Sequence, residues 1–220
     1  MQAFFDINNI FFTVLGYPMS YVEFFGTALN ILSVWLVARN KILNWPVGIV
    51  GVVLFGALYW QIHLYSDFLE QIYYLFTGFW GWWAWSRGKN NEEKTSHVTS
   101  LQNSARLFWC GTIIIGTLAL GYITAHLHLF APGYFPVAAS FPYLDAFTTV
   151  LSFVATIFLV RKQIESWLLW IAVDIIGIWL YWVKEVRLVA LLYVLFLIMA
   201  TQGLFIWFRL KRSVTLNQQP

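Results

Sequence analysis

The amino-acid sequence predicts an all-α integral membrane protein with seven transmembrane helices, arranged as 3+1+3 with two parallel three-helix repeats. The first observation is composition, because 60% of the 220 residues are hydrophobic, only 10% are charged, and the mean hydropathy is +0.69. Globular domains usually carry about 25% charged residues, and a soluble chain of this length cannot bury so large an apolar fraction. The other two observations are long apolar runs along the whole chain and an internal repeat.

Seven segments are long and apolar enough to cross a bilayer, which requires roughly 20 mostly apolar residues per helix. Short polar breaks separate most of them, and the one long polar loop, SRGKNNEEKTSHVTSLQNSAR, follows the third segment. The segments span residues 21–38, 45–64, 69–86, 107–129, 143–160, 167–184 and 188–208.

The two ends of the chain lie outside these segments. Residues 1–20 lack the basic start and small-residue cleavage site of a signal peptide, and Asp6 interrupts their apolar character. We therefore expect an interfacial helix over residues 1–20, a transmembrane domain over 21–209 and a cytoplasmic tail over 210–220.

The positions of lysine and arginine predict the orientation, because these residues collect on the cytoplasmic side of a membrane. With the N-terminus outside, all 13 lysines and arginines except Lys184 and Arg187 fall on the cytoplasmic side. We therefore expect an external N-terminus and a cytoplasmic C-terminus.

The chain also matches itself when it is shifted by 122 positions. Arg39 then aligns with Arg161 and Trp85 with Trp207, and matches of such residues are uncommon by chance. Because each repeat has three helices, the single helix between them restores the direction of the second repeat. SWEET-type transporters have this layout, and carriers built from repeats place their solute sites near the middle of the membrane. The sequence predicts a transporter with repeat one at 21–87, a linker helix at 107–129 and repeat two at 143–209.

Asp174 is the most informative polar residue, since it lies inside the apolar run LLWIAVDIIGIWLYWVKE. A carboxylate at mid-membrane is costly and usually functional. Within that run the nearest cation is Lys184, ten residues or about 15 Å along the helix. We expect Asp174 to face a polar cavity or a solute. The full set of candidate substrate-binding residues, all within or at the ends of the predicted spans, is Gln61, Gln71, Asp174, Trp182, Lys184, Tyr193 and Gln202.

These side chains offer aromatic surfaces, amides, one carboxylate and a nearby ammonium group, which suit a flat solute that is positively charged or rich in hydroxyl groups. Other classes of protein fit less well. A photoreceptor would need a lysine within the seventh span, and an enzyme would need paired histidines or carboxylates at one depth. No P-loop motif is present. We expect no cofactor, metal ion or nucleic-acid partner, and the alternative that stays open is a SWEET-like sugar carrier.

Several motifs in this order resemble the PnuC family of nicotinamide riboside transporters. They are NWPVGIVG, YWQIHLYSDFLEQIYY, GFWGWWAWSR, YLDAF, SWLLWIAVDIIGIWLYWVKE and ALLYVLF. The resemblance covers nearly all of residues 21–209 except the loop after the third span. It implies a homotrimeric carrier in the inner membrane of a bacterium. Such a carrier moves a vitamin B3 precursor by facilitated diffusion, and phosphorylation in the cytoplasm traps the solute.

The resemblance also implies roles for the candidate residues. Trp182 and Tyr193 would stack on the pyridinium ring, and the two amides of Gln61 and Gln71 would bind the substrate amide or ribose. Asp174 would accept hydrogen bonds from hydroxyl groups or balance the positive charge. Lys184 would contact ribose oxygens or pair with Glu185. Some members of the family carry Asn in place of Asp174, which favours the hydrogen-bonding role, and some transport thiamine or riboflavin.

Overall fold

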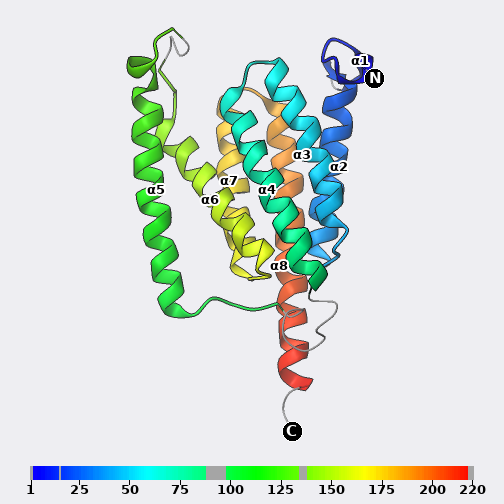
Figure 1. Ribbon diagram of the computed structural model, residues 1–220, viewed down its shortest axis with the longest axis vertical. Helices are drawn as coiled ribbons and strands as arrows, with labels where there is room; N and C mark the ends of the chain where they lie inside the picture. Colours follow the sequence, from blue (N-terminus) through cyan, green and yellow to red (C-terminus); the bar gives the residue numbers. More distant parts are fainter. Residues whose placement is uncertain (1, 15, 88–97, 134–137, 218–220) are drawn as a thin grey trace. The chain divides into compact units, whose positions relative to one another are not determined.

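The computed structural model describes residues 2–14, 16–87, 98–133 and 138–217, and nearly all of the structure in these ranges is helical (Figure 1). A short helix and a hairpin precede seven long helices. The elements are α1 (Gln2–Phe5), β1 (Ile10–Val14), β2 (Tyr17–Ser20), α2 (Tyr21–Ala38), α3 (Asn44–Gln61), α4 (Tyr65–Arg87), α5 (Asn103–Phe130), α6 (Pro142–Val160), α7 (Glu165–Val183) and α8 (Arg187–Asn217).

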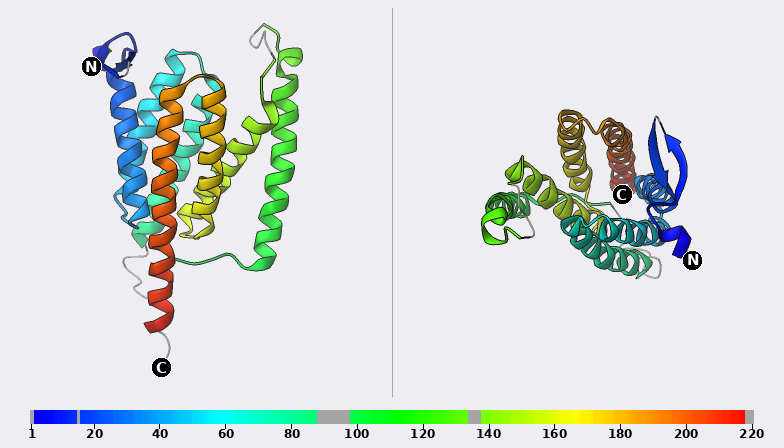
Figure 2. Two further views of the ribbon diagram at one scale, coloured as in Figure 1. Left: turned by 180° about the vertical axis from the view of Figure 1, so that it is seen from behind. Right: turned by 90° about the horizontal axis from the view of Figure 1, so that it is seen from above.

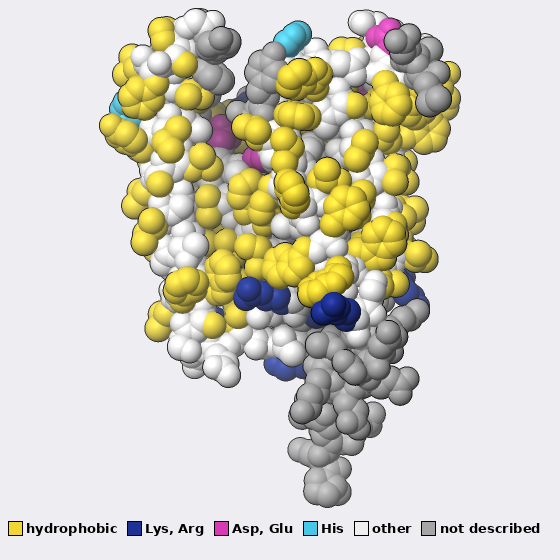
Figure 3. Space-filling model, viewed as in Figure 1, with side chains coloured by type: hydrophobic (Ala, Val, Ile, Leu, Met, Phe, Trp, Pro, Cys, Tyr) yellow, Lys and Arg dark blue, Asp and Glu magenta, His cyan; other side chains and the backbone are white. Residues whose placement is uncertain are grey.

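The seven long helices coincide with the seven predicted spans to within a few residues, apart from the extension of α8 past 208. The shortest, α2 and α3, have 18 residues each, which gives about 27 Å at 1.5 Å per residue and nearly matches a hydrocarbon core of about 30 Å. Within the described part of the chain, five helices also meet a strict hydropathy criterion, namely α2, α5, α6, α7 and α8. In α3 and α4 polar side chains, together with glycine, tryptophan and tyrosine, lower the mean hydropathy. Apolar side chains cover most of the helix surface visible in Figure 3.

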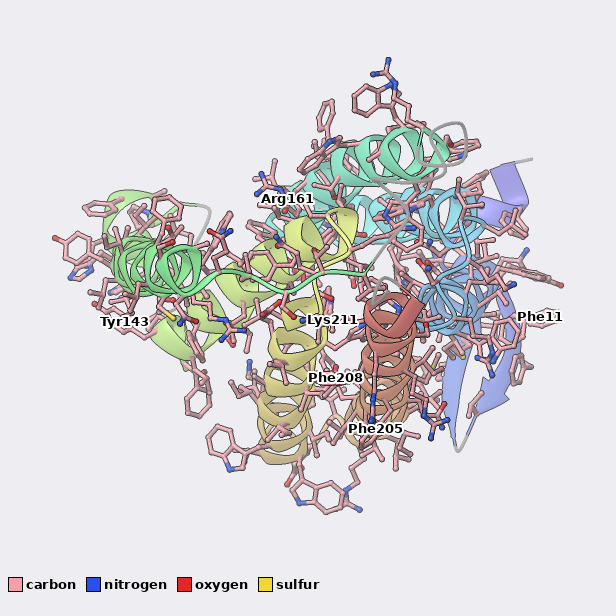
Figure 4. The ribbon with its side chains drawn as sticks, turned by 90° about the horizontal axis from the view of Figure 1, so that it is seen from below. Phe11, Tyr143, Arg161, Phe205, Phe208 and Lys211 are labelled. Carbon is pink, nitrogen blue, oxygen red and sulfur yellow. The ribbon has the colours of Figure 1, made fainter. Side chains whose placement is uncertain are left out.

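The prediction of a helix over residues 1–20 was wrong for most of that segment. Of the described residues in this segment, only Gln2–Phe5 are helical, and β1 and β2 form an antiparallel hairpin that packs beside α2 (Figure 2). Gly16, with φ of +85°, and Pro18 favour a turn and an edge strand over a helix. Phe11 extends from the hairpin (Figure 4), and its ring lies 4.7 Å from that of Tyr21. The hairpin is therefore anchored to the N-terminal end of α2 by aromatic contacts.

The chain forms two compact units, which we describe separately. The first comprises residues 1–97 and 205–220; in it α2 packs on α3 and α3 packs on α4. The second comprises residues 98–204; in it α5 packs along α6 and α6 along α7.

The end of α8 belongs to the first unit, where Trp207 is fully buried. Its indole N–H donates to the Val37 carbonyl at 3.2 Å, and its ring centroid lies 6.3 Å from that of Trp85. Repeat two thus ends on a buried contact with α2 and α4.

The backbone repeats at the same offset of 122 that relates the two halves of the sequence. Asn40 and Lys162, which are equivalent, both have a positive φ, of 54° and 53°. His63 and Glu185 form a second equivalent pair, with φ of 60° and 61°. Each of these residues ends a helix in the left-handed conformation, and the following N–H closes onto the helix in every case, as from Lys41 to Leu36 (3.0 Å) and from Gln163 to Phe158 (2.9 Å).

Side-chain packing repeats as well. In the first unit the ring of Trp45 lies directly against Gly81, and in the second the ring of Trp167 lies directly against Gly203. In each case a Cβ atom on the glycine would overlap the indole, so the close approach of two helices requires glycine. The two three-helix repeats therefore share both their turns and a close contact between glycine and tryptophan.

Candidate substrate site

Asp174 lies in the second unit on a face of α7 that it shares with Gly177 and Tyr181, at spacings of three and seven residues. Only 4% of Asp174 is exposed. Among the described residues, its carboxyl group has no hydrogen-bond or ion-pair partner. A buried carboxyl group without a partner is rare because burial of the charged form costs several kcal/mol. This residue is therefore the leading candidate for direct contact with a solute.

A pair of tyrosine rings lies on the same face, about two turns further along α7. Tyr181 and Tyr193, which comes from α8, stack with their ring centroids 5.3 Å apart and their planes at 24°. The ring of Tyr193 lies directly against Gly177. Tyr193 was among the predicted site residues, whereas Gly177 and Tyr181 were not, although their spacing from Asp174 was visible in the sequence. The two rings form an aromatic surface close to a buried carboxyl group.

Lys184 follows the C-terminal end of α7, past this face, and pairs with a residue of α6. Its ammonium nitrogen lies 3.8 Å from the Oδ1 atom of Asp145, at the start of α6, whereas the family resemblance offered ribose oxygens or Glu185 as its partner. Both side chains are about 40% exposed, so the pair contributes little to stability. The pair joins α6 to α7 at the external end predicted for both helices.

Trp182 and Gln202 lie on surfaces that protein does not cover. Trp182 is 62% exposed, and the guanidinium group of Arg187 lies 5.9 Å from its ring centroid. Gln202 is exposed on α8, nine residues or about 13.5 Å beyond Tyr193 along the helix. The structure does not bring either residue to Asp174 within the second unit, so neither belongs to the face that Asp174 shares with the tyrosine pair.

The two remaining candidates, Gln61 and Gln71, line one groove in the first unit. The groove lies between α3 and α4, has a volume of about 560 Å³, and is otherwise walled by apolar and aromatic side chains, including Trp60 and Phe68. The rings of these two residues are 5.2 Å apart. The two predicted amides therefore line a single groove, and their contact with substrate stays a prediction.

Gln61 is already occupied by protein groups. Its Nε2 atom donates to the carbonyls of Phe5 (2.7 Å) and Ala57 (3.0 Å), and its Oε1 atom accepts from the N–H of Ile7 (3.4 Å). It therefore fastens the N-terminal segment to the end of α3. Within the described part of the chain, Gln71 makes only a long bond in its own helix, from Nε2 to the Asp67 carbonyl at 3.4 Å, so its amide is the more available of the two.

The described residues contain no cluster of three or more histidine, cysteine or acidic side chains that could hold a metal ion. His126, in the sequence HLH, instead forms a 2.9 Å hydrogen bond from its Nδ1 atom to the Tyr122 carbonyl of its own helix. Packed apolar helices, an internal repeat, and a buried carboxyl group beside an aromatic surface are the features of a membrane transporter of small molecules.

The chain belongs to the nicotinamide mononucleotide transporter family, whose model matches residues 20–209. It is 29% identical over 231 residues to the nicotinamide riboside transporter PnuC of Escherichia coli, covering 96% of each chain. It is 28% identical over 206 residues to the Neisseria mucosa protein of the same name, covering 89% of this chain and 74% of the relative. It is also 26% identical over 211 residues to the riboflavin/roseoflavin transporter RibM of Streptomyces davaonensis, covering 94% and 93%.

A solved structure is similar as well. The chain matches a crystal structure of the vitamin B3 transporter PnuC with a TM-score of 0.67 and 24% identity, covering 88% of this chain and 83% of the other. This match establishes the fold. The protein is thus a multi-pass membrane transporter of this family, and the sequence-based assignment of family and fold class is confirmed.

Proposed function

We propose that this protein carries nicotinamide riboside across the inner membrane of a bacterium. The observation that carries the proposal is Asp174, which is buried, has no partner among the described residues, and lies on the same helix face as the Tyr181–Tyr193 pair. The relatives that are named as nicotinamide riboside transporters support the same substrate.

The chemistry of the solute fits this face. Nicotinamide riboside is a flat pyridinium cation that carries an amide and the hydroxyl groups of a ribose. An aromatic surface attracts a flat cation through its π-electrons, and a carboxylate in a low-dielectric site is stabilised by a positive charge or by hydroxyl donors. We propose that the ring stacks on the tyrosine pair and that Asp174 contacts the positive charge or the ribose.

We propose uniport by alternating access, with phosphorylation in the cytoplasm trapping the solute. The sequence has no P-loop motif, so the chain itself has no recognisable means of hydrolysing ATP. In keeping with the family resemblance, we propose a homotrimer in which each subunit has its own pathway.

We propose that the N-terminus is external and the C-terminus cytoplasmic. The two cations that would be external under this orientation both have local partners, because Lys184 pairs with Asp145 and Arg187 lies near the ring of Trp182. Such pairing reduces the conflict of these two residues with the positive-inside rule.

Riboflavin is the second candidate substrate, because the RibM relative aligns over 94% of this chain at nearly the same identity. The flavin ring is flat and aromatic but carries no positive charge. The carboxyl group of Asp174 therefore favours nicotinamide riboside on electrostatic grounds, whereas the tyrosine pair suits either solute.

Calorimetric titration of the detergent-purified protein tests the assignment, with nicotinamide riboside, riboflavin, thiamine and glucose as ligands. We expect binding of nicotinamide riboside and a large loss of that binding in Tyr193→Ala, with Gln202→Ala as a control on the exposed side of α8. Binding of riboflavin or thiamine in place of the riboside would contradict the substrate, and binding of glucose would favour a sugar carrier.

A further inference from the structure

The two repeats build their aromatic stacks differently at equivalent positions. In repeat one, Phe55 and Tyr59 of α3 stack within a single helix, with centroids 5.8 Å apart and planes at 18°. The equivalent residues of repeat two are Gly177 and Tyr181, so α7 has glycine at the position where α3 has the ring of Phe55. The ring comes instead from Tyr193 of α8, at 5.3 Å and 24°.

Gly177 leaves the space in which the ring of Tyr193 can stack on Tyr181. A Cβ atom at this position would overlap the Cδ1, Cε1 and Cγ atoms of Tyr193, so any side chain there displaces the ring or pushes α8 away from α7. The residue of repeat one that is equivalent to Tyr193 is Gln71, which has no ring. The glycine and the tyrosine therefore belong together as a feature of repeat two alone.

The position of this pair links it to the solute. Gly177 follows Asp174 by three residues, which places it one turn away on the same face of α7. Because the two rings come from different helices, their spacing and tilt depend on how closely α7 approaches α8, and Gly177 sets this approach.

We propose that Gly177 is a specificity-determining positioning residue, which admits Tyr193 to the face of Asp174 and thereby gives the carrier its preference for flat heteroaromatic solutes. This inference rests on the proposed function in that it requires an aromatic substrate. Gly177 itself acts through Tyr193 and contributes no contact of its own.

The test compares four full-length proteins: wild type, Gly177→Ala, Tyr193→Ala and the double variant. Affinities for nicotinamide riboside, riboflavin and thiamine are measured for each by calorimetry. We expect Gly177→Ala to weaken binding of the preferred aromatic solute about tenfold. We expect no further loss when Gly177→Ala is added to Tyr193→Ala, because residues that act through a shared contact are not additive.

Gly121→Ala is the matched control, because Gly121 makes the same kind of close contact in the second unit. The ring of Tyr143 at the start of α6 (Figure 4) lies directly against Gly121 of α5, on helices other than α7 and α8. We expect this variant to lower the thermal midpoint by an amount similar to Gly177→Ala while leaving solute affinity at the wild-type value.

Three results would overturn the inference: unchanged affinity in Gly177→Ala, an equal loss from this substitution with and without Tyr193, or an equal loss in Gly121→Ala. A wild-type protein that binds riboflavin or thiamine but not nicotinamide riboside would refute the proposed substrate alone, and the same four proteins would then test Gly177 with that solute. A wild-type protein that binds no aromatic solute would refute both.

Discussion

Replacement of Asp174 by asparagine keeps the shape of the side chain and removes its charge, so it separates the two roles open to this residue. The carboxyl group is only 4% exposed. Lys184 lies ten residues away, about 15 Å along α7. At an effective dielectric constant of about 20, a unit charge at that distance contributes only about 1 kcal/mol. The carboxylate is thus not neutralised by Lys184.

A pyridinium ring about 5 Å from the carboxylate would contribute about 3 kcal/mol at the same dielectric constant, which corresponds to roughly 100-fold in affinity. Removal of the charge also removes part of the cost of burying it, so the observed loss should be smaller than this limit. We therefore expect Asp174→Asn to bind nicotinamide riboside about 10- to 100-fold more weakly than wild type.

The assay is calorimetry with two ligands that differ only in charge: nicotinamide riboside and its neutral analogue, in which a benzamide ring replaces the pyridinium. Loss of affinity for the cation, with the neutral analogue changed by less than about threefold, is the expected result. Equal affinities of wild type and Asp174→Asn for the cation would refute the electrostatic reasoning and assign Asp174 to hydrogen bonding. Equal losses for both ligands would point to a general disturbance of the site.

Three further substitutions test other parts of the structure. Trp207→Phe removes the buried bond to the Val37 carbonyl, and we expect it to lower the free energy of unfolding by about 1–3 kcal/mol, measured by thermal unfolding in detergent; no change would contradict a role for this bond. Trp182→Ala should leave solute affinity within about threefold of wild type because this ring is exposed. A tenfold loss of affinity, measured by calorimetry, would show that Trp182 contacts the solute. Gln61→Ala should release residues 5–7 and speed limited proteolysis before residue 20, with Gln202→Ala as control; an unchanged cleavage rate would show that Gln61 does not hold this segment.

The fold could be predicted because the bilayer leaves few choices for a chain of this composition. Each run of roughly 20 apolar residues has to be helical, since no water is available to satisfy its backbone groups. The repeat could be seen in matching tryptophans and arginines, and the turns at Asn40 and Lys162 show the same backbone conformation. The N-terminal segment lies before the first long apolar run, where a short apolar stretch is compatible with helix or strand.

The site could be predicted only where the cost of burial singles out one residue. Asp174 could be predicted because a carboxyl group inside an apolar membrane helix is energetically costly and is usually kept for a function. The partners of Lys184 and Gln61 could not be found this way, since Asp145 and Phe5 lie far from them in the sequence. The role of Gly177 depends on its contact with the ring of Tyr193, which belongs to the next helix. The sequence of α7 alone therefore could not predict this role.

Uptake of labelled nicotinamide riboside into proteoliposomes tests the central claim most directly. Vesicles are compared with and without an enclosed riboside kinase and ATP, and with and without a pH gradient. The account predicts that the internal concentration rises to the external concentration and no higher without the kinase, that it is independent of the pH gradient, and that label accumulates further when the kinase is enclosed. Failure of the riboside to enter would contradict the substrate, and accumulation that requires the pH gradient would contradict facilitated diffusion.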